Sequence, residues 1–277
     1  MTLAITGATG HIGGMTARLL ADEGRRLRLL VRDPSRAPEL PGADVRQASY
    51  GDERTVEALR GVDTALMVSG AESDDRVGEH RAFVEAAVEA GVRQVVYTSF
   101  VGAGAASAFL HGRDHGATEE IIRSSGLAWT FLRDNFYSEV WPLYADESGT
   151  IRGPAGDGRV ATVSRRDVAE VAALVLRHPE AHSGAAYDLT GPRALTLGEI
   201  AATLTQVTGR AHRFVDETME EARASRSHFG APDWLVDAWI STYTAIRDGE
   251  LEAVSQDVPR LLGRPATSFE EAMRAMR

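Results

Sequence analysis

The sequence predicts an α/β protein with an open parallel sheet and a small, mostly helical C-terminal lobe. In the first half of the chain, short apolar runs alternate with amphipathic stretches, which is the pattern of repeated βα units. The connections between them are short, as compact α/β domains require. From about residue 196 onward the apolar spacing is mostly helical.

The individual elements follow from the same spacing. The expected strands are the short apolar runs 3–6, 27–31, 45–47, 64–68, 94–99, 129–132 and 185–189. The expected helices lie near 12–23, 53–60, 77–90, 115–125, 168–176, 197–207, 218–225, 234–246 and 269–276. In the helix at 77–90, Val77, Val84, Ala87 and Val88 are placed on one face, and Gly91 is expected to end it.

A glycine-rich loop follows the first expected strand and opens the first expected helix. It is Gly7-Ala8-Thr9-Gly10-His11-Ile12-Gly13. Here the first glycine permits a sharp turn, the second lets the backbone approach a pyrophosphate, and the third lets the helix pack close to the strand. The phosphates would lie at the helix N-terminus, whose N–H groups attract anions. The loop therefore predicts a Rossmann-type, doubly wound sheet that binds a nicotinamide dinucleotide; a structural turn that binds nothing is the alternative.

The residues after the second strand favour NADP(H) over NAD(H). An acidic side chain about 20 residues beyond the loop would bind the ribose hydroxyls of NAD. Asp33 has this spacing, but it precedes Pro34 and is expected to cap a helical turn. Arg32 and Arg36 are then free to bind a 2′-phosphate through guanidinium hydrogen bonds. A solvated surface charge is the alternative for each arginine.

The organisation places the expected site at one edge of the sheet. We expect a dinucleotide-binding domain of residues 1–134 with 159–190, and a smaller substrate-binding lobe of 135–158 with 191–277. Open α/β sheets bind ligands beyond the carboxyl ends of their strands. A cleft between this lobe and that edge is therefore the expected site.

Composition excludes several kinds of chemistry. The chain has no Cys, which excludes thiol nucleophiles and Cys-ligated metals, and it has no Lys, since Arg supplies all 30 basic residues. A Tyr–Lys catalytic pair is therefore excluded. His111 and His115 lack an HExxH pattern, so no metal site is expected. The net charge of −10 and the absence of long apolar runs argue against nucleic-acid and membrane partners. We expect a cytoplasmic monomer or homodimer that acts on a small molecule.

Several short motifs give the chain a specific resemblance. They are the glycine loop, Val31-Arg32-Asp33-Pro34, Tyr50-Gly51-Asp52, Tyr97-Thr98-Ser99, and Asp114-His115 with Thr118-Glu119. Together they resemble the NmrA-like atypical short-chain dehydrogenases. Leu132-Arg133, Phe136-Tyr137-Ser138-Glu139 and the glycine-rich segment 153–158 make the chain most similar to bacterial type 2 NAD(P)H:quinone oxidoreductases. The pair Asp134-Asn135 departs from the Asn-Gly pair of that subgroup.

The resemblance implies an activity and a set of cofactor residues. It implies hydride transfer from NADPH to a quinone or similar flat conjugated acceptor without a Tyr–Lys pair, which agrees with the absence of Lys. The residues that it implies for the cofactor are Gly7, Thr9, Gly10, His11, Ile12, Gly13 and Arg32, with Ser69 and Gly70 on the adenosine side. A redox-sensing NmrA-type regulator that binds NADP(H) without turnover, or a pathway-specific reductase of an aromatic natural product, are the alternatives.

The acceptor side of the site is expected to be aromatic. Reduction of a quinone gives an aromatic hydroquinone, so the protein mainly has to orient the ring beside the cofactor. The candidate walls for such a ring are Phe100, Phe109, Phe136, Tyr137 and Trp141, with ordinary core packing as the alternative for each. Tyr137 and His115 are the candidate proton donors. His115 and Glu119 are four residues apart on an expected helix, so Glu119 could orient the imidazole; a structural pair is the alternative.

Overall fold

The computed structural model describes residues 1–276 and divides the chain into two compact units. Unit 1 comprises Met1–Ser99, Asp114–Arg133 and Arg166–Tyr187. Unit 2 comprises Phe100–Arg113, Asp134–Arg165 and the chain from Asp188 onward. Each unit is described by itself below.

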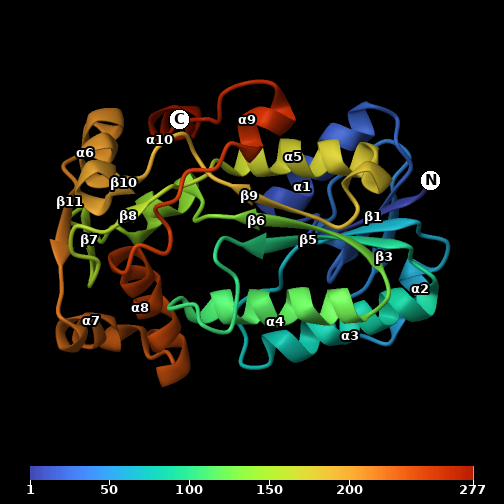
Figure 1. Ribbon diagram of the computed structural model, residues 1–277, viewed down its shortest axis with the longest axis horizontal. Coiled ribbons are helices and arrows are strands. Elements are labelled where there is room, and N and C mark those ends of the chain that lie inside the picture. Colours follow the sequence, from blue (N-terminus) through green and yellow to red (C-terminus); the bar gives the residue numbers. More distant parts are fainter. Residues whose placement is uncertain (277) are drawn as a thin grey trace. The chain divides into compact units, whose positions relative to one another are not determined.

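The main sheet is of the expected doubly wound type. Within the described residues its strand order is β3-β2-β1-β4-β5-β6-β9 (Figure 1). The strands are β1 (Leu3–Thr6), β2 (Leu27–Val31), β3 (Asp44–Gln47), β4 (Thr64–Met67), β5 (Gln94–Phe100), β6 (Ala128–Asp134) and β9 (Ala185–Leu189). Strand β1 pairs in parallel with both β2 and β4. The chain runs outward from β1 to β3 and then returns to the other side of β1, so the strand order reverses between β1 and β4, where such sheets bind ligands.

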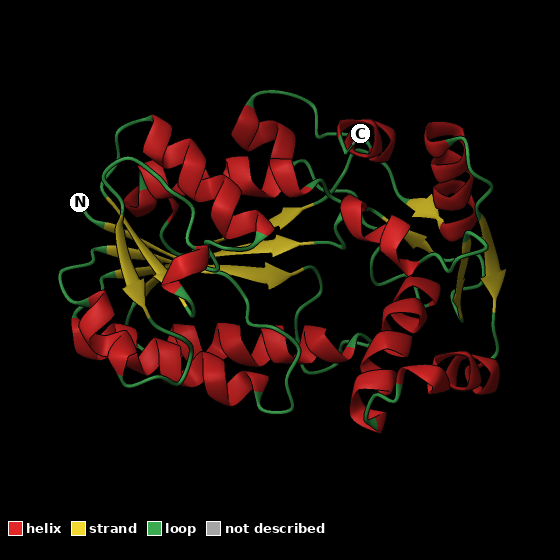
Figure 2. Ribbon diagram, turned by 180° about the vertical axis from the view of Figure 1, so that it is seen from behind, coloured by secondary structure: helices red, strands yellow, loops and turns green. Residues whose placement is uncertain are grey.

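Helices cover both faces of this sheet. They are α1 (His11–Asp22), α2 (Arg54–Leu59), α3 (Arg76–Ala90), α4 (Leu110–Ser124) and α5 (Arg165–Arg177), with short 3-10 turns at Pro34–Arg36 and Pro179–His182. In unit 1, α1 and α5 lie on one face and α2, α3 and α4 on the other (Figures 1 and 2). Strands β1 and β4 are buried along their whole length, because both faces are covered.

The end of helix α3 agrees with the expectation from the sequence, but its buried face includes residues that the apolar spacing did not predict. Gly91 ends it in the left-handed conformation with φ of 79°, as expected. Val84 and Ala87 face the core, whereas Val88 is 45% exposed at the edge of the same face. The buried face also includes His80 and Phe83. A polar His in the core is not visible to a pattern that counts only apolar residues.

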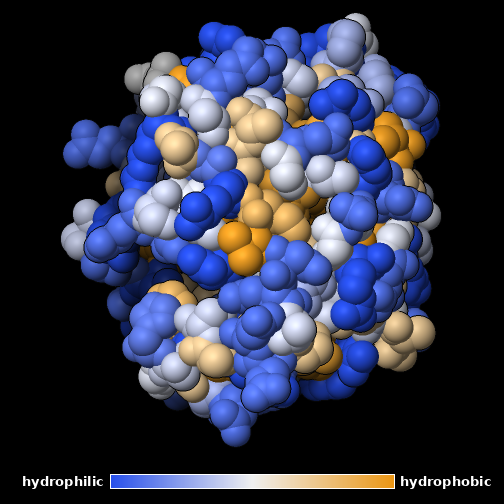
Figure 3. All heavy atoms as spheres, turned by 90° about the vertical axis from the view of Figure 1, so that its left-hand side faces the viewer, coloured by the Kyte–Doolittle hydropathy of each residue, from blue (hydrophilic) through white to orange (hydrophobic). Residues whose placement is uncertain are grey.

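Unit 2 contains short strands as well as helices. Its elements are a 3-10 turn at Ser138–Tyr144, β7 (Thr150–Gly153), β8 (Arg159–Val160), β10 (Leu195–Thr196), α6 (Leu197–Thr208), β11 (Arg213–Asp216), α7 (Met219–Arg226), a 3-10 turn at Ser227–Phe229, α8 (Asp233–Arg247), α9 (Asp257–Leu262) and α10 (Phe269–Ala275). Strand β11 pairs in parallel with β7, and β10 pairs antiparallel with β8. The face that carries α6, α7 and β11 is mainly hydrophilic around a small apolar area (Figure 3).

Several elements differ from the sequence expectations. Strands β10 and β11 and helix α9 were not expected, since each is short and gives little periodic signal. Helix α4 begins at Leu110 rather than near 115. A Cβ at position 112 would lie 2.7 Å from the hydroxyl of Ser107, so Gly112 permits a close approach in the first turn of this helix. In residues 1–276, no helix has the length and apolar character needed to cross a membrane.

Candidate functional site

The glycine loop of unit 1 has the geometry that dinucleotide binding requires. Gly7 adopts the left-handed conformation with φ of 61° and begins the turn after β1. A Cβ on Gly13 would lie 2.5 Å from the carbonyl oxygens of both Thr6 and Gly7, so only glycine lets α1 pack this close to β1. Gly10 is different, because the nearest atom to its added Cβ is the Gly7 carbonyl oxygen at 3.3 Å. The absence of a side chain there leaves the loop surface open to a ligand.

The N-terminus of α1 is suited to an anion. Gly10 is its N-cap residue. Gly10 has no side chain to cap this end of α1, and the first turn of α1 contains no acidic residue. The first N–H groups of a helix have no partner within the helix, and the helix dipole adds partial positive charge there. Thr9, Gly10 and His11 are exposed, whereas Ile12 and Gly13 are buried in the packing of α1.

The residues after β2 have the expected arrangement. Asp33 caps the turn Pro34–Arg36, because its carboxylate accepts hydrogen bonds from the Ser35 amide (3.0 Å) and hydroxyl (2.7 Å). These bonds lower the pKa of Asp33 below its ordinary value. Arg32 and Arg36 are both exposed. The capping role of Asp33 is confirmed, and its carboxylate is already engaged by Ser35.

The segment after β4 brings Ser69 and Gly70 to the same region of unit 1 as the glycine loop. A Cβ on Gly7 would lie 3.1 Å from the Cβ of Val68, so the two loops are in contact. The Ser69 amide donates to the hydroxyl of Thr98 (2.8 Å), and the Gly70 amide donates to Nε2 of His80 (2.9 Å). The two loops follow β1 and β4, the strands that flank the reversal of strand order.

His115 is buried in unit 1, and both ring nitrogens have partners. Nδ1 is 2.9 Å from the hydroxyl of Tyr97, and Nε2 is 3.2 Å from a guanidinium nitrogen of Arg76. An arginine can only donate, so Nε2 accepts and carries no proton. The Glu119 carboxylate, expected to orient this ring, accepts instead from Ser99, Arg123 and Arg133. That expected pairing was wrong, because residues on β5, β6 and α3 are nearer partners than the helical neighbour.

Tyr137 lies in unit 2 and its hydroxyl donates to the carboxylate of Asp134. The guanidinium of Arg165 lies over its ring, 5.4 Å from the centroid. Burial, and then the adjacent Asp134 carboxylate, raise the pKa of Tyr137 well above its ordinary value. The phenol therefore stays protonated at physiological pH. Asn135, the second residue of the departing pair, is buried and donates through Nδ2 to the Leu251 carbonyl oxygen (3.0 Å).

The remaining aromatic candidates form one cluster in unit 2. Phe100 and Phe109 have ring centroids 4.8 Å apart, and Phe136 is 5.1 and 5.2 Å from them. Trp141 lies 6.2 Å from Phe136. Phe100, Phe109 and Trp141 belong to the hydrophobic core of unit 2, and Phe136 packs against it while partly buried. Phe136 and Tyr137 are thus the members with surface available to a ligand.

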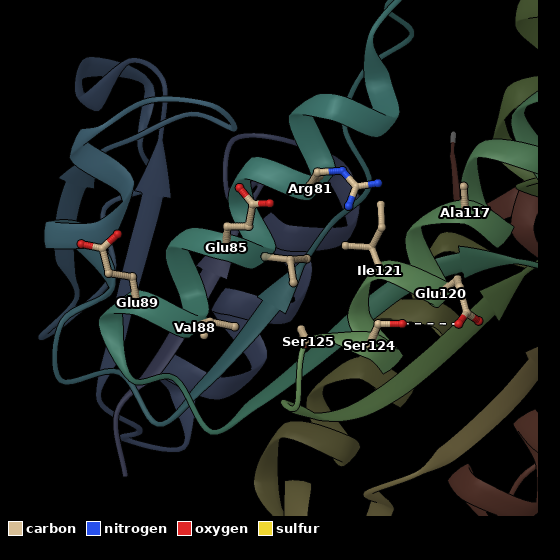
Figure 4. A pocket seen from close by; sticks show the side chains of 10 residues that line it. Arg81, Glu85, Val88, Glu89, Ala117, Glu120, Ile121, Ser124 and Ser125 are labelled. Carbon is tan, nitrogen blue, oxygen red and sulfur yellow. Dashed lines mark hydrogen bonds between the residues drawn. The ribbon is translucent and has the colours of Figure 1, made fainter.

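A groove of about 720 Å³ runs between α3 and α4 of unit 1 (Figure 4). Its lining residues are Arg81, Val84, Glu85, Val88, Glu89, Ala117, Glu120, Ile121, Ser124 and Ser125. None of the site residues expected from the sequence lines it. Three of its lining residues are glutamates, which would repel phosphates, so this groove does not suit a dinucleotide. Among residues 1–276, no group of three or more His, Cys, Asp or Glu side chains could hold a metal ion.

Sequence reasoning missed several residues that hold the loop after β4. His80 and Arg76 bond to Gly70, and Tyr50 bonds to the Val68 carbonyl oxygen. Tyr50 belongs to the Tyr50-Gly51-Asp52 motif, whose spacing alone does not predict this hydrogen bond. His80 and Arg76 lie four residues apart on α3, and their burial was the missing signal.

Comparison with known proteins identifies relatives of the whole chain. A family model described as NAD(P)H-binding matches residues 7–179. The NAD(P)H azoreductase of Xenophilus azovorans is 35% identical over 99% of this chain and 97% of its own length. The structure of an NADPH-dependent quinone oxidoreductase of Escherichia coli, complexed with NADPH, is 34% identical, covers 99% of both chains and has a TM-score of 0.90. The structure of a Citrobacter triphenylmethane reductase complexed with NADP(H) is 30% identical, covers 100% of both chains and has a TM-score of 0.87.

Proposed function

The chain belongs to the family described as NAD(P)H-binding, and we propose that it uses NADPH to reduce a quinone or a similarly flat, conjugated small molecule. It is an NAD(P)H-dependent reductase of the quinone oxidoreductase, azoreductase and triphenylmethane reductase type. The observation that carries the proposal is the glycine loop, in which Gly13 is pressed against β1 while Gly10 leaves an open surface at the uncapped N-terminus of α1.

Unit 1 would hold the cofactor. The loop from Gly7 to Gly13, including Thr9, His11 and Ile12, would surround the pyrophosphate, with Ser69 and Gly70 beside the adenosine. Arg32 and Arg36 would bind the 2′-phosphate, because Asp33 is occupied by capping and does not compete for it. When bound, NADPH supplies a hydride. The protein contributes binding and orientation.

Unit 2 would supply the surface for the acceptor. The chain has no Lys and therefore no Tyr–Lys pair to supply a proton. An acceptor that gains aromatic character on reduction needs little acid catalysis, so the main contribution of the protein is to orient the acceptor. Phe136 and Tyr137 would contact the acceptor ring, backed by the packed Phe100, Phe109 and Trp141. Tyr137 is proposed to orient the acceptor or to give it a proton, and proton transfer would require its hydroxyl to turn from the Asp134 carboxylate. Both nitrogens of His115 are committed to Tyr97 and Arg76, which favours a structural role for it over proton transfer.

The first test is steady-state oxidation of NADPH, followed by loss of absorbance, with benzoquinones, naphthoquinones, azo dyes and triphenylmethane dyes as acceptors. We expect turnover with at least one quinone and faster turnover with NADPH than with NADH. Tight NADP(H) binding without turnover of any acceptor would contradict the enzyme proposal and favour a redox-sensing regulator. Turnover of azo or triphenylmethane dyes with no quinone reduced would narrow the acceptor to the other flat, conjugated molecules of the proposal.

Arg32→Ala is expected to lower kcat/KM for NADPH about 10- to 100-fold, since one charge-assisted contact to the 2′-phosphate contributes about 1.5–3 kcal/mol. The value for NADH should change less than about two-fold. Arg26→Ala is the matched control, because Arg26 is an exposed arginine just before β2, whereas Arg32 follows β2. An unchanged NADPH preference in Arg32→Ala would show that Arg32 does not bind the 2′-phosphate.

A further inference from the structure

The chain leaves the sheet after Met67, the last residue of β4. In the next residues, main-chain N–H and C=O groups form hydrogen bonds with side chains instead of with a neighbouring strand. The Val68 amide donates to the hydroxyl oxygen of Thr6 (2.9 Å), and the hydroxyl of Tyr50 donates to the Val68 carbonyl oxygen (2.5 Å). The oxygens of Thr6 and Tyr50 are 2.7 Å apart. Because the single Tyr50 proton goes to Val68, the Thr6 hydroxyl donates to Tyr50 and shares its proton with the Leu66 carbonyl oxygen at 3.1 Å. The result is a closed ring of hydrogen bonds that begins and ends at Val68.

The next two residues are held in the same manner. The Ser69 amide donates to Thr98 on β5, and the Gly70 amide donates to Nε2 of His80 on α3. An amide can only donate, so Nε2 is unprotonated, and the ring proton on Nδ1 is donated to Thr118 (2.8 Å). Burial, and then the nearby Arg76 charge, lower the pKa of His80 to about 3, which keeps the ring neutral.

This network ties the two loops of the proposed cofactor site to each other. Thr6 is the last residue of β1 and directly precedes Gly7. Its hydroxyl accepts from Val68, and Val68 also packs against Gly7. The ring of Tyr50 packs on the ring of Phe83, with centroids 4.8 Å apart, and this packing fixes the position of the Tyr50 hydroxyl. Burial raises the pKa of the Tyr50 hydroxyl, which therefore remains a donor.

We propose that Tyr50, Thr98 and His80 are positioning residues for the dinucleotide. They hold Val68–Gly70 in the shape that meets the bound cofactor and act through that loop, because their polar atoms are already bonded to it. A loop ordered in advance loses less conformational freedom on binding, so affinity depends on these bonds. This inference rests on the proposed function, since it concerns the same cofactor.

The test compares matched variants by direct nucleotide binding. Thr98→Val removes the acceptor for the Ser69 amide at nearly constant shape, whereas Thr98→Ser keeps it. Tyr50→Phe removes the hydroxyl and keeps the ring. We expect the Kd for NADP+, measured by isothermal titration, to rise about ten-fold in Thr98→Val and Tyr50→Phe, or about 1.4 kcal/mol. Thr98→Ser should stay within about two-fold of the original chain, and kcat at saturating NADPH should be unchanged in all three.

Two further measurements separate positioning from a general loss of stability. Thr130→Val is the control, because Thr130 is a fully buried threonine of β6 that bonds to Gln94 and to the His182 carbonyl oxygen. It should lower the free energy of unfolding without changing the Kd. Amide hydrogen exchange of the nucleotide-free protein should be faster at Ser69 in Thr98→Val but not in Thr130→Val.

The outcomes are distinguishable. If exchange at Ser69 accelerates in Thr98→Val while its Kd stays unchanged, the positioning role is overturned and the proposed function stands. If Thr130→Val raises the Kd as much as Thr98→Val, the effect is only one of stability, and the positioning role is again overturned. If the unsubstituted chain binds no nicotinamide nucleotide, the proposed function fails, and the positioning role fails with it. Tyr50→Phe provides the same tests should Thr98→Val not fold.

Discussion

Replacing Gly13 by alanine is expected to lower the free energy of unfolding by about 3 kcal/mol and to abolish dinucleotide binding. The new Cβ would lie 2.5 Å from the carbonyl oxygens of Thr6 and Gly7, and both are main-chain atoms that cannot rotate away. Relief requires α1 to move away from β1, which displaces the helix N-terminus from the loop. Urea denaturation gives the stability, and titration with NADP+ gives the affinity.

Gly10→Ala is the matched control for this prediction. Its Cβ would meet only the Gly7 carbonyl oxygen, at 3.3 Å, and its φ of −96° is open to alanine. We expect unfolding within about 1 kcal/mol of the original chain, but weaker binding, because the methyl group would occupy the surface that the phosphates approach. Equal stability of Gly13→Ala and Gly10→Ala would refute the close-packing role of Gly13.

The geometry of the glycine loop could be predicted from the sequence because its requirements are local. A sharp turn, a close helix–strand contact and an open surface each demand glycine at a fixed spacing, and Gly7, Gly13 and Gly10 meet these demands in that order. The cap at Asp33 was predictable for the same reason, since its partner is two residues away. Most strands and helices followed from apolar periodicity, which also depends only on near neighbours.

The side-chain network of unit 1 could not be predicted, because its partners come from distant parts of the chain. The spacing of His115 and Glu119 suggested a pair on one helix. In the structure His115 bonds to Tyr97 and Arg76, and Glu119 bonds to Ser99 and Arg133. Local spacing indicates which residues share a helix face. Which strand residues contact that face depends on the strand order and register of the sheet.

The hydrogen bond of Tyr137 could also not be predicted, although its partner is only three residues away. The departure at Asp134 was visible in the sequence, but its bond to the Tyr137 hydroxyl was not. This bond changes the chemistry expected of Tyr137, because a phenol that donates to a carboxylate and has a raised pKa is a weaker acid. Under the proposed function, this weaker acid favours acceptors whose reduction needs little acid assistance.

Glu119→Gln is expected to lower the free energy of unfolding by about 3 kcal/mol, the second large effect. Glu119 is 1% exposed, and its two oxygens accept from Arg133 (2.8 and 2.6 Å), Arg123 (2.9 Å) and Ser99 (2.6 Å). The glutamine side chain is neutral, so the Arg133 guanidinium would lose its counter-charge. The NH2 group of the glutamine would also face a guanidinium, which places one hydrogen-bond donor against another. Glu120→Gln is the control, with a side chain 74% exposed and 3.9 Å from Arg123, and should change stability by less than about 0.5 kcal/mol.

A double-substitution cycle shows whether the loss comes from this ion pair. Arg133→Gln removes the charge that Glu119→Gln leaves unpaired, so the combined loss should be smaller than the sum of the two single losses by more than about 1 kcal/mol. Additive losses would mean that Glu119 acts mainly through Ser99 and Arg123.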